Sequence, residues 1–474
     1  MIKKTLFISL FSIILGATPS FALDHTKAQH PGKMVFKPLT FSPAKAERTV
    51  LKDGMVLYVL EDHELPVINL SATIRTGSIY EPEEKAGLAK LTGKVMRTGG
   101  TSSLTPDEIN DQLEYIAGIM EVSIGRESGS ASLSVMKKDI DMGLKIFADV
   151  LISPRLSQKK LDLAKKQEVE AIRRENDNPN SIAFREFRRF LYRDNPRGRI
   201  PTKESINAIT RGDLVDFHSR FFTKENIILG VSGDFNKDKI ARKIEKAFQG
   251  WQKTSMNIPK PPPPEQSYDK FIGYAFKGVP QSTIVTGHLT VNKKHPDHYP
   301  FKILNFILGE GGFSSRLTSE IRSNRGLAYS VRSFYRGDVD YGVFVALCQT
   351  KSKTTYQALS LIYKIIKGLK EDGVTDAELA WAKESIMNKF VFSFTSSYSI
   401  VNQQMQLEYD EMPQHFLEDY LDNISKVTLE DIKRVANEYL HPDRSLIVIV
   451  GNGRDFDTPL SEFGEVNEID LKEE

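Results

Sequence analysis

Residues 308–333 read LGEGGFSSRLTSEIRSNRGLAYSVRS, and this stretch decides how the chain is interpreted. Its pattern predicts a glycine-rich loop, a short amphipathic helix, a turn at Gly326 and the start of a strand. Arg322 falls late in the expected helix, and Tyr329 follows just past the turn. A guanidinium and a phenol placed in this way can converge on a peptide carbonyl or a developing oxyanion, because both donate hydrogen bonds. The residues alone favour a plainer interpretation, a solvated helix arginine and a tyrosine packed at a strand edge.

The same stretch resembles part of a known family. The pattern has three parts, Leu308-Gly-Glu-Gly-Gly-Phe-Ser-Ser-Arg-Leu, Glu320-Ile-Arg322 and Gly326-Leu-Ala-Tyr329. Together they are similar to the second domain of the insulinase/pitrilysin-type zinc peptidases, to which the mitochondrial processing peptidase belongs. In that family an Arg and a Tyr at this spacing bind the substrate carbonyl beside a zinc ion, so the resemblance implies a catalytic role for Arg322 and Tyr329. It also implies substrate contacts for the glycines of the expected loop, Gly309, Gly311 and Gly312.

The first residues have the pattern of a secretory signal. Lys3 and Lys4 precede an apolar run over residues 5–16, and small residues lead to Ala22. The run is too short to cross a membrane comfortably, so we predict a signal peptide over residues 1–22 that is cleaved after Ala22. The mature protein is then expected in the periplasm, without a membrane anchor.

Charge and cysteine usage exclude several classes of function. Without Lys3 and Lys4, 62 basic residues balance 62 acidic ones, so nothing indicates nucleic acid or an anionic surface as a partner. The single cysteine, Cys348, excludes an internal disulfide. It lies in an apolar run and is expected to be a small core residue and not a nucleophile.

A proline-rich segment divides the chain. It contains four consecutive prolines at 261–264, which favour an extended spacer. We predict an N-terminal extension, a first domain, a linker and a second domain over residues 23–45, 46–254, 255–267 and 268–474. The halves repeat, because a shift of 218 positions aligns identical residues in unbroken register, among them Leu161 with Leu379, Ala164 with Ala382 and Thr210 with Thr428.

The patterns predict an α+β fold with two homologous domains. Each domain alternates strands and helix pairs, which is typical of a mainly antiparallel sheet packed with helices. In the first half we expect a hairpin over 48–60, a strand over 67–74, helices near 85–96, 140–151, 157–174 and 210–220, and a closing strand over 226–232. The family resemblance, which covers nearly all of residues 36–454, implies the LuxS/processing-peptidase-like metallohydrolase fold, with two domains that close like a clam around a chamber.

The metal site of the family is altered in the first half. Active relatives carry His-x-x-Glu-His on a helix, with two imidazoles that chelate zinc and a glutamate that activates water. The matching positions here are Lys90, Gly93 and Lys94. A protonated ammonium offers no lone pair to a metal, and glycine cannot act as a base. The nine histidines provide no substitute motif. We therefore expect no metal and no cofactor in this chain.

The third zinc ligand of the family is a glutamate, and the resemblance assigns it to Glu175, one helical repeat after Glu168. Glu175 has two interpretations. It can be a solvated helix residue, or it can pair with Lys90 or Lys94, so that an ammonium stands where zinc stood.

Retention of the Arg and Tyr without the metal motif resembles one subunit of the bacterial heterodimers of this family. The resemblance implies a partner that carries His-x-x-Glu-His and zinc, and peptide substrates that are hydrolysed at that zinc with help from Arg322 and Tyr329. The alternative is an inactive peptide-binding or scaffold protein. An independent peptidase is disfavoured, because the sequence shows no activated nucleophile.

Overall fold

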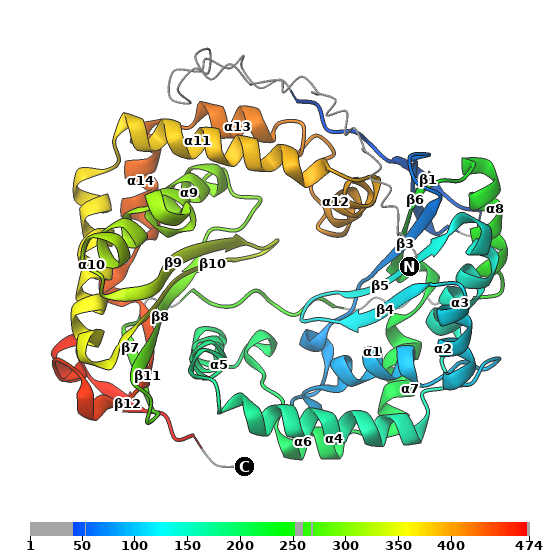
Figure 1. Cartoon of the computed structure of the whole chain (residues 1–474), viewed down its shortest axis with the longest axis horizontal. Coiled ribbons are helices and arrows are strands. Elements are labelled where there is room, and N and C mark those ends of the chain that lie inside the picture. Colours follow the sequence, from blue (N-terminus) through cyan, green and yellow to red (C-terminus); the bar gives the residue numbers. More distant parts are fainter. Residues whose placement is uncertain (1–40, 53, 252–258, 267–268, 472–474) are drawn as a thin grey trace, which may run out of the picture. The chain divides into compact units, whose positions relative to one another are not determined.

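The computed structural model describes residues 41–471, except for 53, 252–258 and 267–268 (Figure 1). The predicted signal peptide, most of the N-terminal extension and part of the linker lie outside the described residues. Ser42–Glu474 form one compact unit. In the part of the chain that the structure describes, no helix has the length and apolar character needed to cross a membrane.

The first sheet contains six strands in the order β1-β2-β6-β3-β5-β4. Their bounds are β1 Glu47–Val50, β2 Val56–Glu61, β3 Val67–Ile74, β4 Ile119–Ile124, β5 Gly129–Met136 and β6 Ile227–Gly233. Only the β2–β6 pair is parallel. The predicted hairpin, the strand over 67–74 and the closing strand are all confirmed.

Eight α-helices belong to the described part of the first half. They are α1 Leu88–Thr98, α2 Pro106–Tyr115, α3 Ile140–Ile152, α4 Gln158–Glu175, α5 Pro179–Tyr192, α6 Lys203–Ala208, α7 Arg211–Phe221 and α8 Lys237–Ala247. α2 begins at a capping box in which Thr105 and Glu108 satisfy each other's backbone amides. Sequence reasoning gave α1, α3, α4 and α7 but missed α5, α6 and α8.

The second sheet has the order β12-β7-β11-β8-β10-β9. Its strands are β7 Phe271–Phe276, β8 Gln281–Thr290, β9 Ala328–Gly337, β10 Gly342–Lys351, β11 Leu446–Gly451 and β12 Val466–Glu468. The α-helices of this half are α9 His298–Asn305, α10 Thr355–Asp372, α11 Asp376–Val391, α12 Ser397–Tyr409, α13 Tyr420–Lys426 and α14 Leu429–Tyr439. Apart from β1 and β12, the two sheets have the same strand order.

The helices repeat in the predicted register. α4 and α11 begin 218 positions apart, and so do α7 and α14. The N-caps of α7 and α14 are Thr210 and Thr428, and each forms a capping box with an aspartate three residues later. The expected α+β fold with two homologous halves is therefore confirmed.

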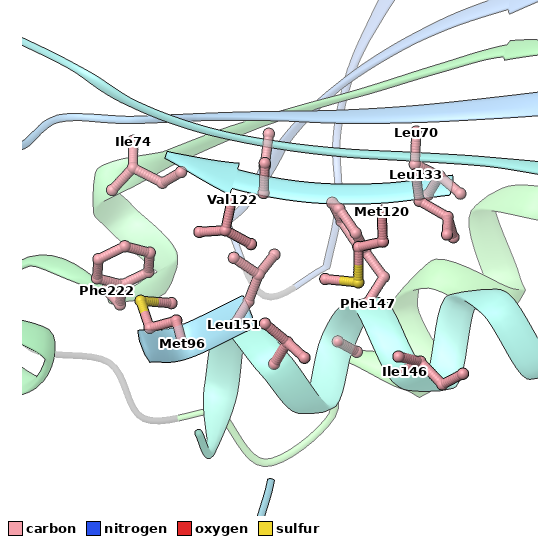
Figure 2. Packing of buried hydrophobic residues seen from close by; sticks show 14 of the residues in the cluster. Leu70, Ile74, Met96, Met120, Val122, Leu133, Ile146, Phe147, Leu151 and Phe222 are labelled. Atoms are coloured by element: carbon pink, nitrogen blue, oxygen red, sulfur yellow. The ribbon is translucent and has the colours of Figure 1, made fainter. Parts of the chain in front are cut away.

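The core of the first half lies between its sheet and its helices (Figure 2). Leu70 and Leu133 project from the sheet towards Ile146, Phe147 and the other apolar side chains of α3. Met96 of α1 and Val122 of β4 belong to the same cluster. Burial of this apolar surface supplies the main driving force for folding of the first half.

Each sheet is also covered by a helix from the other half. α5 packs on β8 and β11 of the second sheet, and α12 packs on β2, β3 and β6 of the first. These two helices are equivalent in the repeat, because their N-caps, Asn178 and Ser396, are 218 positions apart. The two halves thus exchange one helix each, and neither sheet is fully covered by its own half.

Candidate active-site residues in the two halves

Arg322 and Tyr329 lie in contact. The Arg322 guanidinium carbon is 5.1 Å from the centroid of the Tyr329 ring and 4.6 Å from that of Phe313. Within the described ranges, no carboxylate or other acceptor accepts a hydrogen bond from the Arg322 side chain. Its donors therefore remain free for a ligand, and the two aromatic faces stabilise the cation.

A β-bulge directs Tyr329 outward. Ser330 pairs with Gln349 and Ala328 pairs with Thr350, so Tyr329 has no residue opposite it in the β9–β10 ladder. A bulge bends the strand and re-aims the extra side chain. The Tyr329 side chain is accordingly 79% exposed, although both its neighbours in the ladder are paired.

The helix that carries Arg322 is wound more widely than expected. Thr318–Asn324 form a π-helix, and so do Phe306–Glu310 before them. The predicted glycine-rich loop is therefore wrong for its first part, since Gly309 lies inside a helical turn. π-helical turns are rare in proteins, and those that do occur are often found at functional sites.

A cavity of about 560 Å³ opens beside Arg322, and Tyr329 is not among the residues that line it. It lies along β9, the last strand of the second sheet, and is lined by Arg322, Arg332 and Glu310 together with small and aromatic residues. Glu310 accepts a hydrogen bond from Asn305 and lies 3.6 Å from the Lys389 ammonium. Arg332 has no ion-pair partner in the described part of the chain, so the cavity wall carries uncompensated positive charge.

The three glycines of this segment have structural reasons to be glycine. A Cβ at Gly309 would overlap the backbone of Ser333 on β9, and one at Gly311 would overlap the Trp381 ring. Gly312 has a φ of 70°, which favours glycine. Gly309 and Gly312 line the cavity, whereas Gly311 does not. Their contacts with substrate stay a prediction.

In the first half, Lys90 and Lys94 project from α1 one turn apart. The Lys90 ammonium forms an ion pair of 2.5 Å with Glu168 on α4, whose side chain is only 9% exposed. Glu175 instead lies 3.4 Å from the Arg185 guanidinium. Of the two interpretations of Glu175, the pairing with Lys90 or Lys94 is therefore wrong. Lys90 pairs with Glu168, which precedes Glu175 on α4 by one helical repeat. The way in which α1 and α4 cross brings Glu168, and not Glu175, next to Lys90.

Gly93 is buried against β4. A Cβ at this position would lie 3.0 Å from the amide nitrogen of Ile124. Helix and strand therefore approach closely at Gly93, and a larger side chain here would require β4 to shift. Across the described residues, no three His, Cys, Asp or Glu side chains are grouped as a metal site would require.

Sequence reasoning missed Phe313, which stacks against Arg322 and is 66% exposed. An exposed aromatic residue directly after a glycine pair was the available signal. It also missed Arg126 and Arg188, which line two further cavities together. No sequence pattern connects these two arginines, because they lie on different elements.

Comparison with known proteins shows the family of the chain. The profile of the insulinase family (peptidase family M16) matches residues 58–203, and a profile described as the peptidase M16 inactive domain matches residues 208–386. The chain therefore belongs to the insulinase family.

Relatives and solved structures cover most of the chain. An uncharacterized zinc protease of Mycobacterium leprae is 26% identical over 83% of this chain and 89% of its own length. The non-peptidase homolog YmxG of Helicobacter pylori is 26% identical over 83% of this chain and 90% of its own. A peptidase M16 inactive domain from Pseudomonas fluorescens superposes with a TM-score of 0.80 at 24% identity, covering 86% of this chain and 98% of the other. The last likeness shows the shared fold.

Proposed function

We propose that this chain is the non-zinc subunit of a heterodimeric metallopeptidase, and that Arg322 and Tyr329 hold the substrate carbonyl while a partner subunit supplies the zinc. The observation that carries the proposal is the Arg322–Tyr329 contact. Among the described residues, the guanidinium has free donors and β9 pairs only with β10, and the phenol beside this strand edge is exposed through a bulge.

Both donors suit the chemistry of peptide hydrolysis. Attack of a zinc-activated water converts the carbonyl oxygen into an oxyanion, which a guanidinium and a phenol can stabilise by hydrogen bonds. An extended substrate can add to the free edge of β9 by backbone hydrogen bonds, which would select substrates by size more than by sequence. The partner would be a chain of the same family that carries His-x-x-Glu-His, in the periplasm, and the two domains would enclose the substrate in a chamber.

The test is a native purification of the mature chain through a C-terminal tag. We expect a stoichiometric partner with His-x-x-Glu-His and about one zinc per pair. In the assembled pair, Arg322→Ala and Tyr329→Phe should each lower kcat at least roughly tenfold, because each removes a donor to the transition state. Arg325→Ala is the matched control, since Arg325 lies close in sequence but is already paired with Glu320. Unchanged turnover in both variants would refute the proposal.

A second function is a metal-free peptide-binding or scaffold protein. The Lys90–Glu168 pair favours it, as do the profile described as inactive and the relative described as a non-peptidase homolog. A metal-free protein that purifies without a His-x-x-Glu-His partner would support this function over the first.

A further inference from the structure

Two arginines of the first half lack compensating charge. Arg126 lies in the turn between β4 and β5, and Arg188 lies on α5. Both line a cavity of about 410 Å³ between α5 and the second sheet, and both line a second cavity of about 660 Å³ beside α1 and α4. The two guanidinium groups therefore stand where the two cavities meet.

The acidic groups around these cavities are already engaged. Glu175 pairs with Arg185, Asp338 pairs with Arg336, and Glu168 pairs with Lys90. Glu127, next to Arg126 in sequence, accepts hydrogen bonds from Arg197 and from the Tyr341 hydroxyl. Within the described ranges, no carboxylate lies within ion-pair distance of Arg126 or Arg188.

Arg188 is held in an unfavourable position for a lone cation. Its Nε is buried without a hydrogen-bond partner in the described part of the chain, and one Nη contacts only the carbonyl of Arg199 at 3.5 Å. Burial, followed by the charge of Arg126, lowers the pKa of Arg188. An uncompensated buried donor costs free energy, and a bound anion would remove that cost.

The positions of both groups are well defined. The backbone amides of Ser78 and Ile79 donate to the carbonyls of Gly125 and Arg126, which holds the turn in place. The Arg126 guanidinium lies 5.4 Å from the centroid of the Tyr192 ring. Arg188 is anchored by α5, whose apolar face packs on the second sheet through Ile182 and Phe187.

One wall of the smaller cavity is apolar. It is formed by side chains of α5 and of the second sheet, namely Phe184, Phe187, Leu191, Phe334, Val343 and Val345. A ligand that fills this cavity therefore needs an anionic group for the arginines and an apolar group beside it. We propose that Arg126 and Arg188 bind the C-terminal carboxylate of a peptide whose last side chain is apolar.

The position of this site relative to Arg322 and Tyr329 suits a peptide. Phe334 lines both this cavity and the one beside Arg322, so the two cavities adjoin along β9. A strand rises about 3.3 Å per residue, so Tyr329 lies roughly 17 Å from Phe334 along the edge. The bond held by Arg322 and Tyr329 would then lie about five residues from the C-terminus. This inference rests on the proposed function in taking a peptide as the ligand.

The test compares peptides that differ only at the C-terminus. Fluorescence anisotropy of an N-terminally labelled decapeptide ending in leucine is measured with the mature chain, once as the free acid and once as the amide. The acid should bind at least roughly tenfold more tightly, because it adds charge-assisted hydrogen bonds. A free-acid peptide ending in aspartate should bind weakly, because its side chain does not suit the apolar wall.

Variants locate the effect. Arg126→Gln and Arg188→Met should each abolish the preference for the acid. Arg336→Gln is the matched control, because it removes the same charge from the same cavity at an ion-paired, exposed position, and it should leave the preference intact. Arg188→Met should unfold at or above the wild-type temperature, since it removes an uncompensated buried charge. A purely structural arginine would instead lower that temperature.

Each outcome has a distinct meaning. Equal binding of acid and amide by the wild type, or the same loss in Arg336→Gln, would overturn the inference while leaving the role of Arg322 and Tyr329 in turnover to stand. A preference for the acid, in a protein whose native purification yields no His-x-x-Glu-His partner, would support the inference and count against the peptidase function. A fatty acid also carries a carboxylate on an apolar chain. Decanoate is therefore tested as a competitor of the labelled peptide. If it displaces the peptide at a lower concentration than acetyl-leucine does, the site binds fatty acids and the peptide assignment is wrong.

Discussion

Lys90 stands at a position where the family resemblance leads one to expect a metal-binding histidine. Its ammonium meets the nearly buried carboxylate of Glu168 and so supplies positive charge between α1 and α4. A carboxylate in such a position needs a counter-charge, because its hydration is largely lost. The pair therefore gives the altered site a structural role in joining the two helices.

We predict that Lys90→Met lowers the free energy of unfolding by about 1–3 kcal/mol, because it leaves Glu168 without its partner. The lower end is expected, since the Lys90 side chain is 60% exposed and water screens the pair. The double variant with Glu168→Met should recover most of the loss. Chemical denaturation of both variants checks this, and an equally unstable double variant would contradict it.

Glu81 predicts a dependence of stability on pH. It is 4% exposed, and its carboxylate accepts hydrogen bonds from the amides of Gly87 and Ala89 at the start of α1. Burial raises its pKa from 4.5 to about 7, although these hydrogen bonds oppose the shift. The folded state therefore retains a proton that the unfolded state releases, so this group's contribution to stability falls as pH rises from about 4.5 to 7, by up to roughly 3 kcal/mol.

Denaturation near pH 5 and near pH 8 measures this effect, with Glu81→Gln as the comparison. Glutamine cannot ionise, so the stability of the variant relative to wild type should improve between about pH 5 and about pH 8. A constant difference between the two proteins would show that Glu81 does not titrate in this range.

At the residue scale, the sequence singled out Lys90 and Lys94 but did not show what they contact. The spacing of Lys90 and Lys94 was readable, because residues four apart share a helix face. Which of Glu168 and Glu175 meets a lysine depends on how α1 and α4 cross, and no sequence periodicity contains that angle. The contact of Arg322 with Tyr329 was predictable because the two residues are close in sequence, with only the chain turn at Gly326 between them.

At the scale of elements, the packing of α12 depends on a glycine in the sheet of the other half. Gly230 lies in β6, where a Cβ would overlap Met405 of α12 and come within 2.5 Å of a methyl group of Val401. The absence of a side chain lets the helix lie directly on the strand. Periodicity predicts that β6 is a buried strand, but it cannot indicate that a helix far away in sequence covers it.

We predict that Gly230→Ala destabilises the protein by about 1–3 kcal/mol, because the added methyl overpacks this contact. Combination with Val401→Ala should cost less than the sum of the two single changes. The control is Gly368→Ala in α10, where the nearest atom would be 3.9 Å away and alanine should stabilise the helix by roughly 0.5–1 kcal/mol. Thermal unfolding distinguishes these outcomes, and a neutral Gly230→Ala would contradict the packing argument.

For the whole molecule, the exchange of α5 and α12 predicts that the halves do not fold separately. The face of the first sheet under α12 contains Tyr58 and Ile228, and the face of the second sheet under α5 contains Val285 and Val448. Residues 42–251 or 259–471 expressed alone would expose such a face, so we expect aggregation or loss of cooperative unfolding. Co-expression of both fragments should restore a single cooperative transition. Sharp, cooperative unfolding of either fragment alone would contradict this prediction.

The exchanged helices also bear on how such a chain could have arisen. A protein with a single copy of the repeat would carry one uncovered sheet face and one helix shaped to cover such a face on another molecule. Two identical molecules would satisfy both needs by reciprocal exchange, as a two-fold symmetric pair does. Joining the two genes through a short extended linker would then preserve that assembly in one chain. Once joined, the two copies were free to diverge, so that today one carries the Lys90–Glu168 pair and the other the Arg322–Tyr329 contact.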